Sequence, residues 1–63
     1  MKVKDLVEAM VLSRTHLVIK DNNNKQVAYV SGGYESEYSE YAESEVMEIY
    51  SVQPFQIIAQ IWL

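Results

Sequence analysis

The sequence predicts an α+β domain: a small antiparallel β-sheet of about four strands, an N-terminal helix, and a short acidic helix inserted between strands 2 and 3. Two observations support this prediction. Apolar side chains recur with helical spacing at the start and in the middle of the chain, whereas the other apolar stretches alternate with polar residues. With 63 residues, 49% of them hydrophobic, the chain is expected to form a single domain, residues 1–63.

The first helix is predicted from the opening stretch. Four apolar residues stand there at positions i, i+3, i+4 and i+7, which places them on one face of a helix. They are Val3, Leu6, Val7 and Met10. Charged residues fill the other positions, and Lys4 can meet Glu8 one turn later.

A β-hairpin is predicted next. Its strands are the stretch from His16 to Lys20 and the stretch from Gln26 to Val30, both rich in β-branched or aromatic residues. The DNNNK sequence between them contains residue types that tolerate positive φ and bond to their own backbone. A loop of more than two residues should therefore join the strands.

Two glycines end the second strand, and three tyrosines follow with helical spacing. Tyr34, Tyr38 and Tyr41 stand at i, i+4 and i+7, so a helix would gather their rings on one stripe and spread the glutamates around the rest. This is the predicted acidic helix. Its tyrosines either face the sheet or form part of an interface.

Two apolar strands are predicted to close the chain. The third covers residues 46–51, and the fourth follows Pro54 with the clearest alternation in the sequence. One face of the fourth strand carries Phe55, Ile57, Ala59, Ile61 and Leu63, and the other carries Gln56, Ile58, Gln60 and Trp62. The first face is expected to belong to the core. The expected core residues are Leu6, Val27, Ile57 and Ile61.

The second face of that strand predicts self-association. An exposed patch of Ile58 and Trp62 would be a liability in a monomer, so we expect a homodimer with these two residues in its interface. The alternative is that the first helix or a loop covers this face.

Charge divides the chain into two halves. Residues 1–25 contain five basic and three acidic residues, whereas residues 26–63 contain six glutamates and no base. An acidic surface repels phosphates and attracts basic protein surfaces, so we expect a basic protein partner and no direct binding of nucleic acid.

The order of elements resembles that of small orphan proteins encoded by phages and prophages of Gram-positive bacteria. The opening MKVKDLVEAM, the hairpin LVIKDNNNKQVAYV, the acidic insert and the closing EVMEIYSVQPFQIIAQIWL carry the resemblance. It implies expression in the bacterial cytoplasm and a role in occupying a host protein, as anti-CRISPR and other anti-defence inhibitors do. It implies no catalytic residues.

Other sites are less well supported by the sequence. His16 could join Ser13 and Asp21 in a hydrolytic triad, but no nucleophile-elbow pattern surrounds a serine. The stretch from Asp21 to Asn24 supplies oxygen atoms, yet the glycine and the bidentate glutamate of a calcium loop are missing. Without cysteine there is no cysteine-based zinc site and no disulfide, which agrees with a reducing cytoplasm. We expect no catalytic residue, cofactor, metal or membrane span.

The predicted function is therefore non-enzymatic: inhibition of a basic, nucleic-acid-handling host protein, such as a CRISPR effector or another nuclease complex. The alternatives are a non-inhibitory accessory protein of a mobile element and, third, a small hydrolase. The predicted partner-binding residues are Tyr34, Glu35, Glu37, Tyr38, Glu40, Tyr41 and Glu43.

Overall fold

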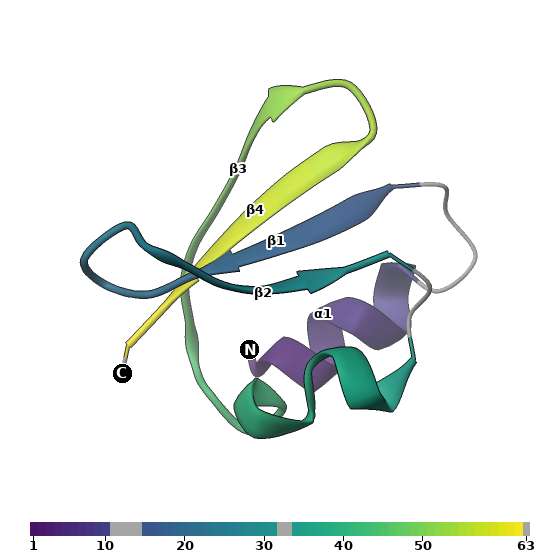
Figure 1. Cartoon of the computed structure of the whole chain (residues 1–63), viewed down its shortest axis with the longest axis vertical. Helices are drawn as coiled ribbons and strands as arrows, with labels where there is room; N and C mark the ends of the chain where they lie inside the picture. The colour runs from purple at the N-terminus through teal and green to yellow at the C-terminus, as the bar shows by residue number, and fades with distance from the viewer. Residues whose placement is uncertain (11–14, 32–33, 63) are drawn as a thin grey trace.

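The computed structural model describes residues 1–10, 15–31 and 34–62 and confirms the α+β class (Figure 1). The chain runs through α1 (Val3–Met10), β1 (His16–Lys20), β2 (Gln26–Val30), the 3-10 turns η1 (Glu35–Glu37) and η2 (Ser39–Tyr41), β3 (Val46–Gln53) and β4 (Gln56–Ile61). The hairpin strands thus begin and end where the sequence predicts, and α1 contains the four apolar residues of the predicted first helix.

The β1–β2 hairpin depends on Asp21. Its Oδ1 accepts hydrogen bonds from the backbone N–H groups of Asn23 (2.8 Å) and Lys25 (2.9 Å), which closes the turn. Asn24 has a φ of 66°, a conformation that asparagine tolerates better than most residues. The carboxylate of Asp21 is therefore used to shape this loop.

The four strands form one sheet in the order β2-β1-β4-β3. The outer pairs are antiparallel, but β1 and β4 are parallel, so the sheet is mixed and the prediction of an antiparallel sheet is wrong for this central pair. The cause lies in the connection after β2, which brings the chain round so that the β3–β4 hairpin adds to the free side of β1.

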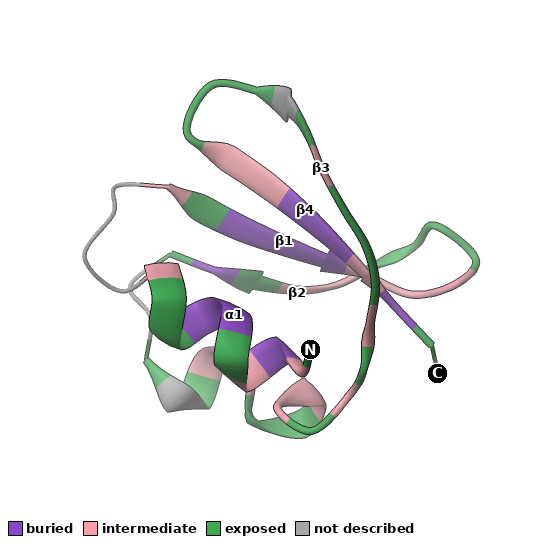
Figure 2. Ribbon diagram, turned by 180° about the vertical axis from the view of Figure 1, so that it is seen from behind, coloured by how far each residue is buried: buried purple, intermediate pink, exposed green. Residues whose placement is uncertain are grey.

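The helix α1 covers one face of the sheet. The buried face of α1 consists of Val3, Leu6 and Val7, which pack against residues of the two central strands (Figure 2). Those strand residues are Leu17, Ile19, Ala59 and Ile61, each at most 1% exposed. The predictions of Leu6 and Ile61 as core residues are confirmed.

The start of α1 is fixed by the segment that precedes β3. The first N–H groups of a helix have no partner within it. Here the backbone N–H of Val3 donates to the carbonyl of Ser44, and that of Lys4 donates to the carbonyl of Ala42, both at 3.0 Å. The carboxylate of Asp5 accepts from the N–H of Lys2 at 3.1 Å. Helix and segment thus form one layer.

The core differs from the prediction along β4. Phe55 lies in the turn before the strand, with a φ of 61° and 73% of its surface exposed, so it is not a core residue. Val27 and Ile57 are only half-buried, although both pack against the core. Leu63 lies outside the described residues.

The expectation of an exposed Ile58 is also wrong, because this side chain is only 5% exposed. The register places it in a row across the sheet on the face opposite α1, with Val18 on one side and Tyr50 on the other, and Tyr29 next to Val18. The central strands have neighbours on both sides, and the flanking side chains shield Ile58. Trp62, beyond the end of β4, is 63% exposed.

None of the helices in the described ranges has the length and apolar character needed to cross a bilayer.

Candidate functional site

The predicted partner-binding residues lie in residues 34–45, here called the turn segment. The acidic α-helix expected there is absent; two 3-10 turns replace it. Tyr38 separates the turns with φ −138° and ψ 9°, outside the helical region. The segment is too short for a stable helix on its own, and its tertiary contacts favour two tight turns.

One of these contacts comes from Glu37. Its carboxylate accepts hydrogen bonds from the backbone N–H of Ser31 (3.0 Å), the hydroxyl of Ser31 (3.1 Å) and the backbone N–H of Tyr34 (3.0 Å). The side chain thereby ties the end of β2 to η1 and provides an acceptor for both backbone N–H groups. Glu37 is a structural residue as well as a carrier of charge.

The three tyrosines do not share one stripe. Tyr38 and Tyr41 are half-buried and pack against the core, three residues apart, which is one turn of a 3-10 helix. Tyr34 is 72% exposed. The three tyrosines therefore serve partly as core, and Tyr34 is the most exposed of them.

Glu43 forms the main electrostatic link between the turn segment and α1. Its two oxygens lie 2.7 Å from Nζ of Lys2 and 2.8 Å from Nζ of Lys4. Hydrogen bonds from Lys2 and Lys4, in that order, followed by their positive charges, lower the pKa of Glu43 to about 2. The hydrogen bond between Lys4 and Glu43, followed by the negative charge of Glu43, raises the pKa of Lys4. Two of the five basic residues thus neutralise part of the acidic segment.

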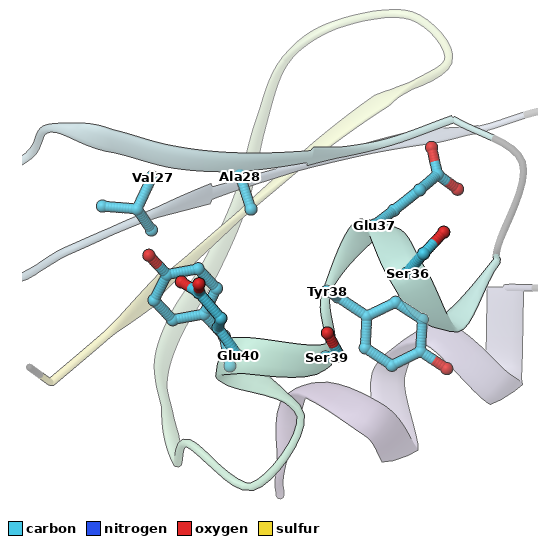
Figure 3. A pocket seen from close by; sticks show the side chains of 8 residues that line it. Val27, Ala28, Ser36, Glu37, Tyr38, Ser39 and Glu40 are labelled. Atoms are coloured by element: carbon cyan, nitrogen blue, oxygen red, sulfur yellow. The ribbon is translucent and has the colours of Figure 1, made fainter.

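A pocket of about 210 Å³ lies between β2 and the turn segment (Figure 3). Val27 and Ala28 of β2 face the turns across it, and Glu40 rises from η2 towards β2. The lining residues are Val27, Ala28, Ser36, Glu37, Tyr38, Ser39, Glu40 and Tyr41. None of them is basic. Glu40 is exposed and forms no hydrogen bond or ion pair with the described part of the chain.

The pocket brings together four of the seven residues predicted to bind a partner: Glu37, Tyr38, Glu40 and Tyr41. Tyr34 and Glu43 lie outside its lining, and the side chain of Glu35 is outside the described part of the chain. The sequence did not identify Val27 and Ala28 as site residues, since only the tertiary fold brings β2 against the turns. The serines carried no signal that distinguishes them from ordinary turn residues.

Two of the residues considered for a hydrolytic triad, His16 and Asp21, have other contacts. Nδ1 of His16 lies 2.5 Å from the hydroxyl of Tyr29, and the two rings meet edge to face at 5.6 Å. Asp21 holds the hairpin loop, and Ser13 lies outside the described residues. Within the described residues, no group of three or more His, Cys, Asp or Glu side chains is arranged to hold a metal ion.

In comparisons with known proteins, no family model matches the chain, and no curated protein or solved structure gives a significant match.

Proposed function

We propose that this chain is a non-enzymatic protein-binding module that recognises a basic, nucleic-acid-handling protein of a bacterial host and inhibits it. The pocket between β2 and the turn segment is the recognition site. It accepts a lysine or arginine side chain of the partner, and the surrounding glutamates attract the partner's basic surface.

The chemistry of the pocket is the observation that carries this proposal. Two carboxylates, Glu37 and Glu40, and two serine hydroxyls line it, with no positive charge among the eight lining residues. At about 210 Å³ it is smaller than the cavities that enclose drug-sized ligands, which are roughly 300–1,000 Å³. A single long side chain is the better match.

A lysine or arginine side chain has two parts, and the pocket offers a contact for each. Val27, Ala28 and the ring of Tyr41 can pack against its methylene stem. The carboxylates can accept hydrogen bonds from its charged head, which are stronger than those between neutral groups. Glu40 is the main candidate, since it makes no bond to the described part of the chain.

The charge around the pocket supports the choice of partner. Six glutamates lie at positions 35–48. In the described residues, Lys2 and Lys4 pair with Glu43, and the N-terminal ammonium group pairs with Glu45. The remaining negative field speeds encounter with a Lys/Arg-rich surface and discriminates against nucleic acid itself. Inhibition would follow if the module covers the surface on which the partner binds DNA or RNA.

Titration with a short arginine-rich peptide tests the pocket. We expect backbone amide shifts at Val27, Ala28 and η2, weakening as salt is added. A peptide of the same length with citrulline for arginine keeps the shape without the charge and should give no shifts. Glu40→Gln should weaken binding, whereas Glu48→Gln serves as the matched control because Glu48 is exposed on β3, outside the pocket. An equal loss of peptide binding in both variants would show that the peptide recognises a nonspecific acidic surface and not the pocket.

Inhibition needs its own test. The protein should capture a nucleic-acid-binding protein from a bacterial lysate at low salt, and added DNA or RNA should compete with that capture. Once the captured protein is identified, its activity should fall on addition of the wild type and fall less with Glu40→Gln. Capture without any change in activity would favour the accessory role over inhibition.

A further inference from the structure

We propose that β3 is an interface for a second copy of this chain: the β3 strands of two copies pair antiparallel about a two-fold axis at Ile49 and join the two sheets. This inference is independent of the proposed pocket, because the pocket lies at the opposite edge of the sheet, beside β2.

The two edges of the sheet differ in how they are protected. The turn segment lies beside β2 and forms the pocket with Val27 and Ala28. At β3, the N-terminal residues cover only the first positions: Lys2 forms an antiparallel bridge with Glu45, and the N–H of Val46 donates to the carbonyl of Met1 at 2.8 Å. Within the described residues, no backbone group of residues 47–50 bonds outside the β3–β4 pair.

The sequence of β3 also contains few of the residues that usually prevent edge pairing. Its eight residues, VMEIYSVQ, contain no Lys, Arg or Pro, and Glu48 is their one charged residue. Met47 is 44% exposed and Ile49 is 45% exposed, which leaves two large apolar side chains at an open edge. The register shifts on either side of Glu48–Tyr50 leave a short regular stretch, so the interface is small and the association should be weak.

Self-complementarity selects the register. With the two-fold axis at Ile49, this residue pairs with Ile49 of the second copy on the face that β3 shares with Ala59. Glu48 then stands opposite Tyr50 of the second copy, and no like charges meet. An axis at Glu48 would place two carboxylates directly opposite each other, which is unfavourable. An axis at Tyr50 would centre the paired residues next to the register shift between Tyr50 and Gln53, where β3 is irregular.

This interface differs from the one predicted at Ile58 and Trp62. Ile58 is buried within its own chain and offers no surface to a partner. Trp62 lies beyond the end of β4, a central strand, and is not on the β3 edge. Variants at Ile49 and Trp62 therefore distinguish the two interfaces.

Single-cysteine variants test the register, because the chain has no native cysteine. Directly opposed residues in antiparallel strands have Cα atoms about 4.5–5.5 Å apart, within reach of a disulfide. Ile49→Cys should therefore crosslink to itself under mild oxidation, at least about tenfold faster than Trp62→Cys because the paired strands raise its effective concentration. Glu48→Cys alone should not crosslink, because Glu48 of one copy lies diagonal to Glu48 of the other, at about 7–8 Å. A mixture of Glu48→Cys and Tyr50→Cys should crosslink, because these two residues stand directly opposite each other.

Sedimentation velocity provides the second test. The mass of the wild type should rise from 7.3 kDa towards twice that value over concentrations of roughly 10 μM to 1 mM, as expected for a small interface. Ile49→Lys should remain at the monomer mass, and an equimolar mixture of Ile49→Lys with Ile49→Glu should regain the dimer. Circular dichroism melts of both variants establish that the monomer is folded.

Several results would overturn the proposal: a wild type that stays at the monomer mass throughout, association that survives Ile49→Lys in a folded variant, or Ile49→Cys crosslinking no faster than Trp62→Cys. Faster crosslinking of Trp62→Cys than of Ile49→Cys would instead support the interface predicted at Ile58 and Trp62. Pairing of β3 with an added peptide strand, without self-association, would assign the edge to a different partner.

Discussion

The carboxylate of Glu43 lies 2.8 Å from the ammonium group of Lys4, a residue 39 positions away in sequence. Together with the 2.7 Å contact to Lys2, this ion pair joins the turn segment to α1. Glu43 therefore links two elements that are far apart in the sequence, and we expect its titration to be visible in the stability of the protein.

The pH dependence follows from the lowered pKa of Glu43. Its pKa falls from the ordinary 4.5 to about 2 on folding, so its stabilising contribution is present above pH 4.5 and is lost as the pH falls from 4.5 through about 2. The melting temperature of the wild type should exceed that of Glu43→Gln at neutral pH, and the difference should shrink as the pH is lowered through this window. A difference that stays constant over the window would show that packing, and not charge, is responsible.

The control for this experiment is Glu40→Gln. Glu40 has no partner in the described part of the chain, so removal of its charge should leave the melting temperature at neutral pH almost unchanged. Added salt should reduce the effect of Glu43→Gln, since the three side chains are partly exposed and their attraction is screened.

Removal of the Glu37 carboxylate should destabilise the fold. Glu37→Ala leaves the N–H groups of Ser31 and Tyr34 without their acceptor, and we expect a loss of about 1–2 kcal/mol in the free energy of unfolding. Urea denaturation measures it, with Glu40→Ala as the neighbour that lacks these bonds. Equal stability of the two variants would contradict the structural role assigned to Glu37.

Truncation of Ile61 should be among the most damaging changes. The side chain is fully buried, so Ile61→Ala should cost about 2–5 kcal/mol, a large part of the total stability expected for a small domain. Ile57→Ala should cost less, because Ile57 on the same strand face is only half-buried. Thermal or urea unfolding of both variants checks the order, and a greater loss for Ile57→Ala would mean that Ile57 is more deeply packed than Ile61 on their common face.

Replacement of Phe55 should stabilise the protein. Its φ of 61° costs a residue with a Cβ atom about 1–2 kcal/mol, and its exposed ring recovers little of that. Phe55→Gly should therefore raise the free energy of unfolding by about 0.5–1 kcal/mol after the entropy of glycine is subtracted. Phe55→Asn is a second variant with the same expected direction. A lower melting temperature in both would reveal a stabilising contact of the ring.

Local pattern was sufficient for the elements that bury one side. The helical spacing from Val3 to Met10 has one arrangement that hides its apolar side chains, the residues from Asp21 to Lys25 favour a turn, and the alternation in β4 favours a strand. The helix α1, the hairpin and the closing strands therefore followed from the sequence. The acidic, aromatic character of the pocket was also visible, because Glu37, Tyr38, Glu40 and Tyr41 are neighbours along the chain.

Tertiary structure decided what depends on contacts between distant residues. The parallel pairing of β1 with β4 follows from the path of the chain after β2, which no local spacing encodes. The turn segment forms 3-10 turns because Glu37 bonds to Ser31 and because the carbonyls of Ala42 and Ser44 cap α1, contacts that outweigh a weak helical preference. The burial of Ile58 likewise depends on its neighbours across the sheet, Val18 and Tyr50, since a strand's own alternation cannot show what flanks it.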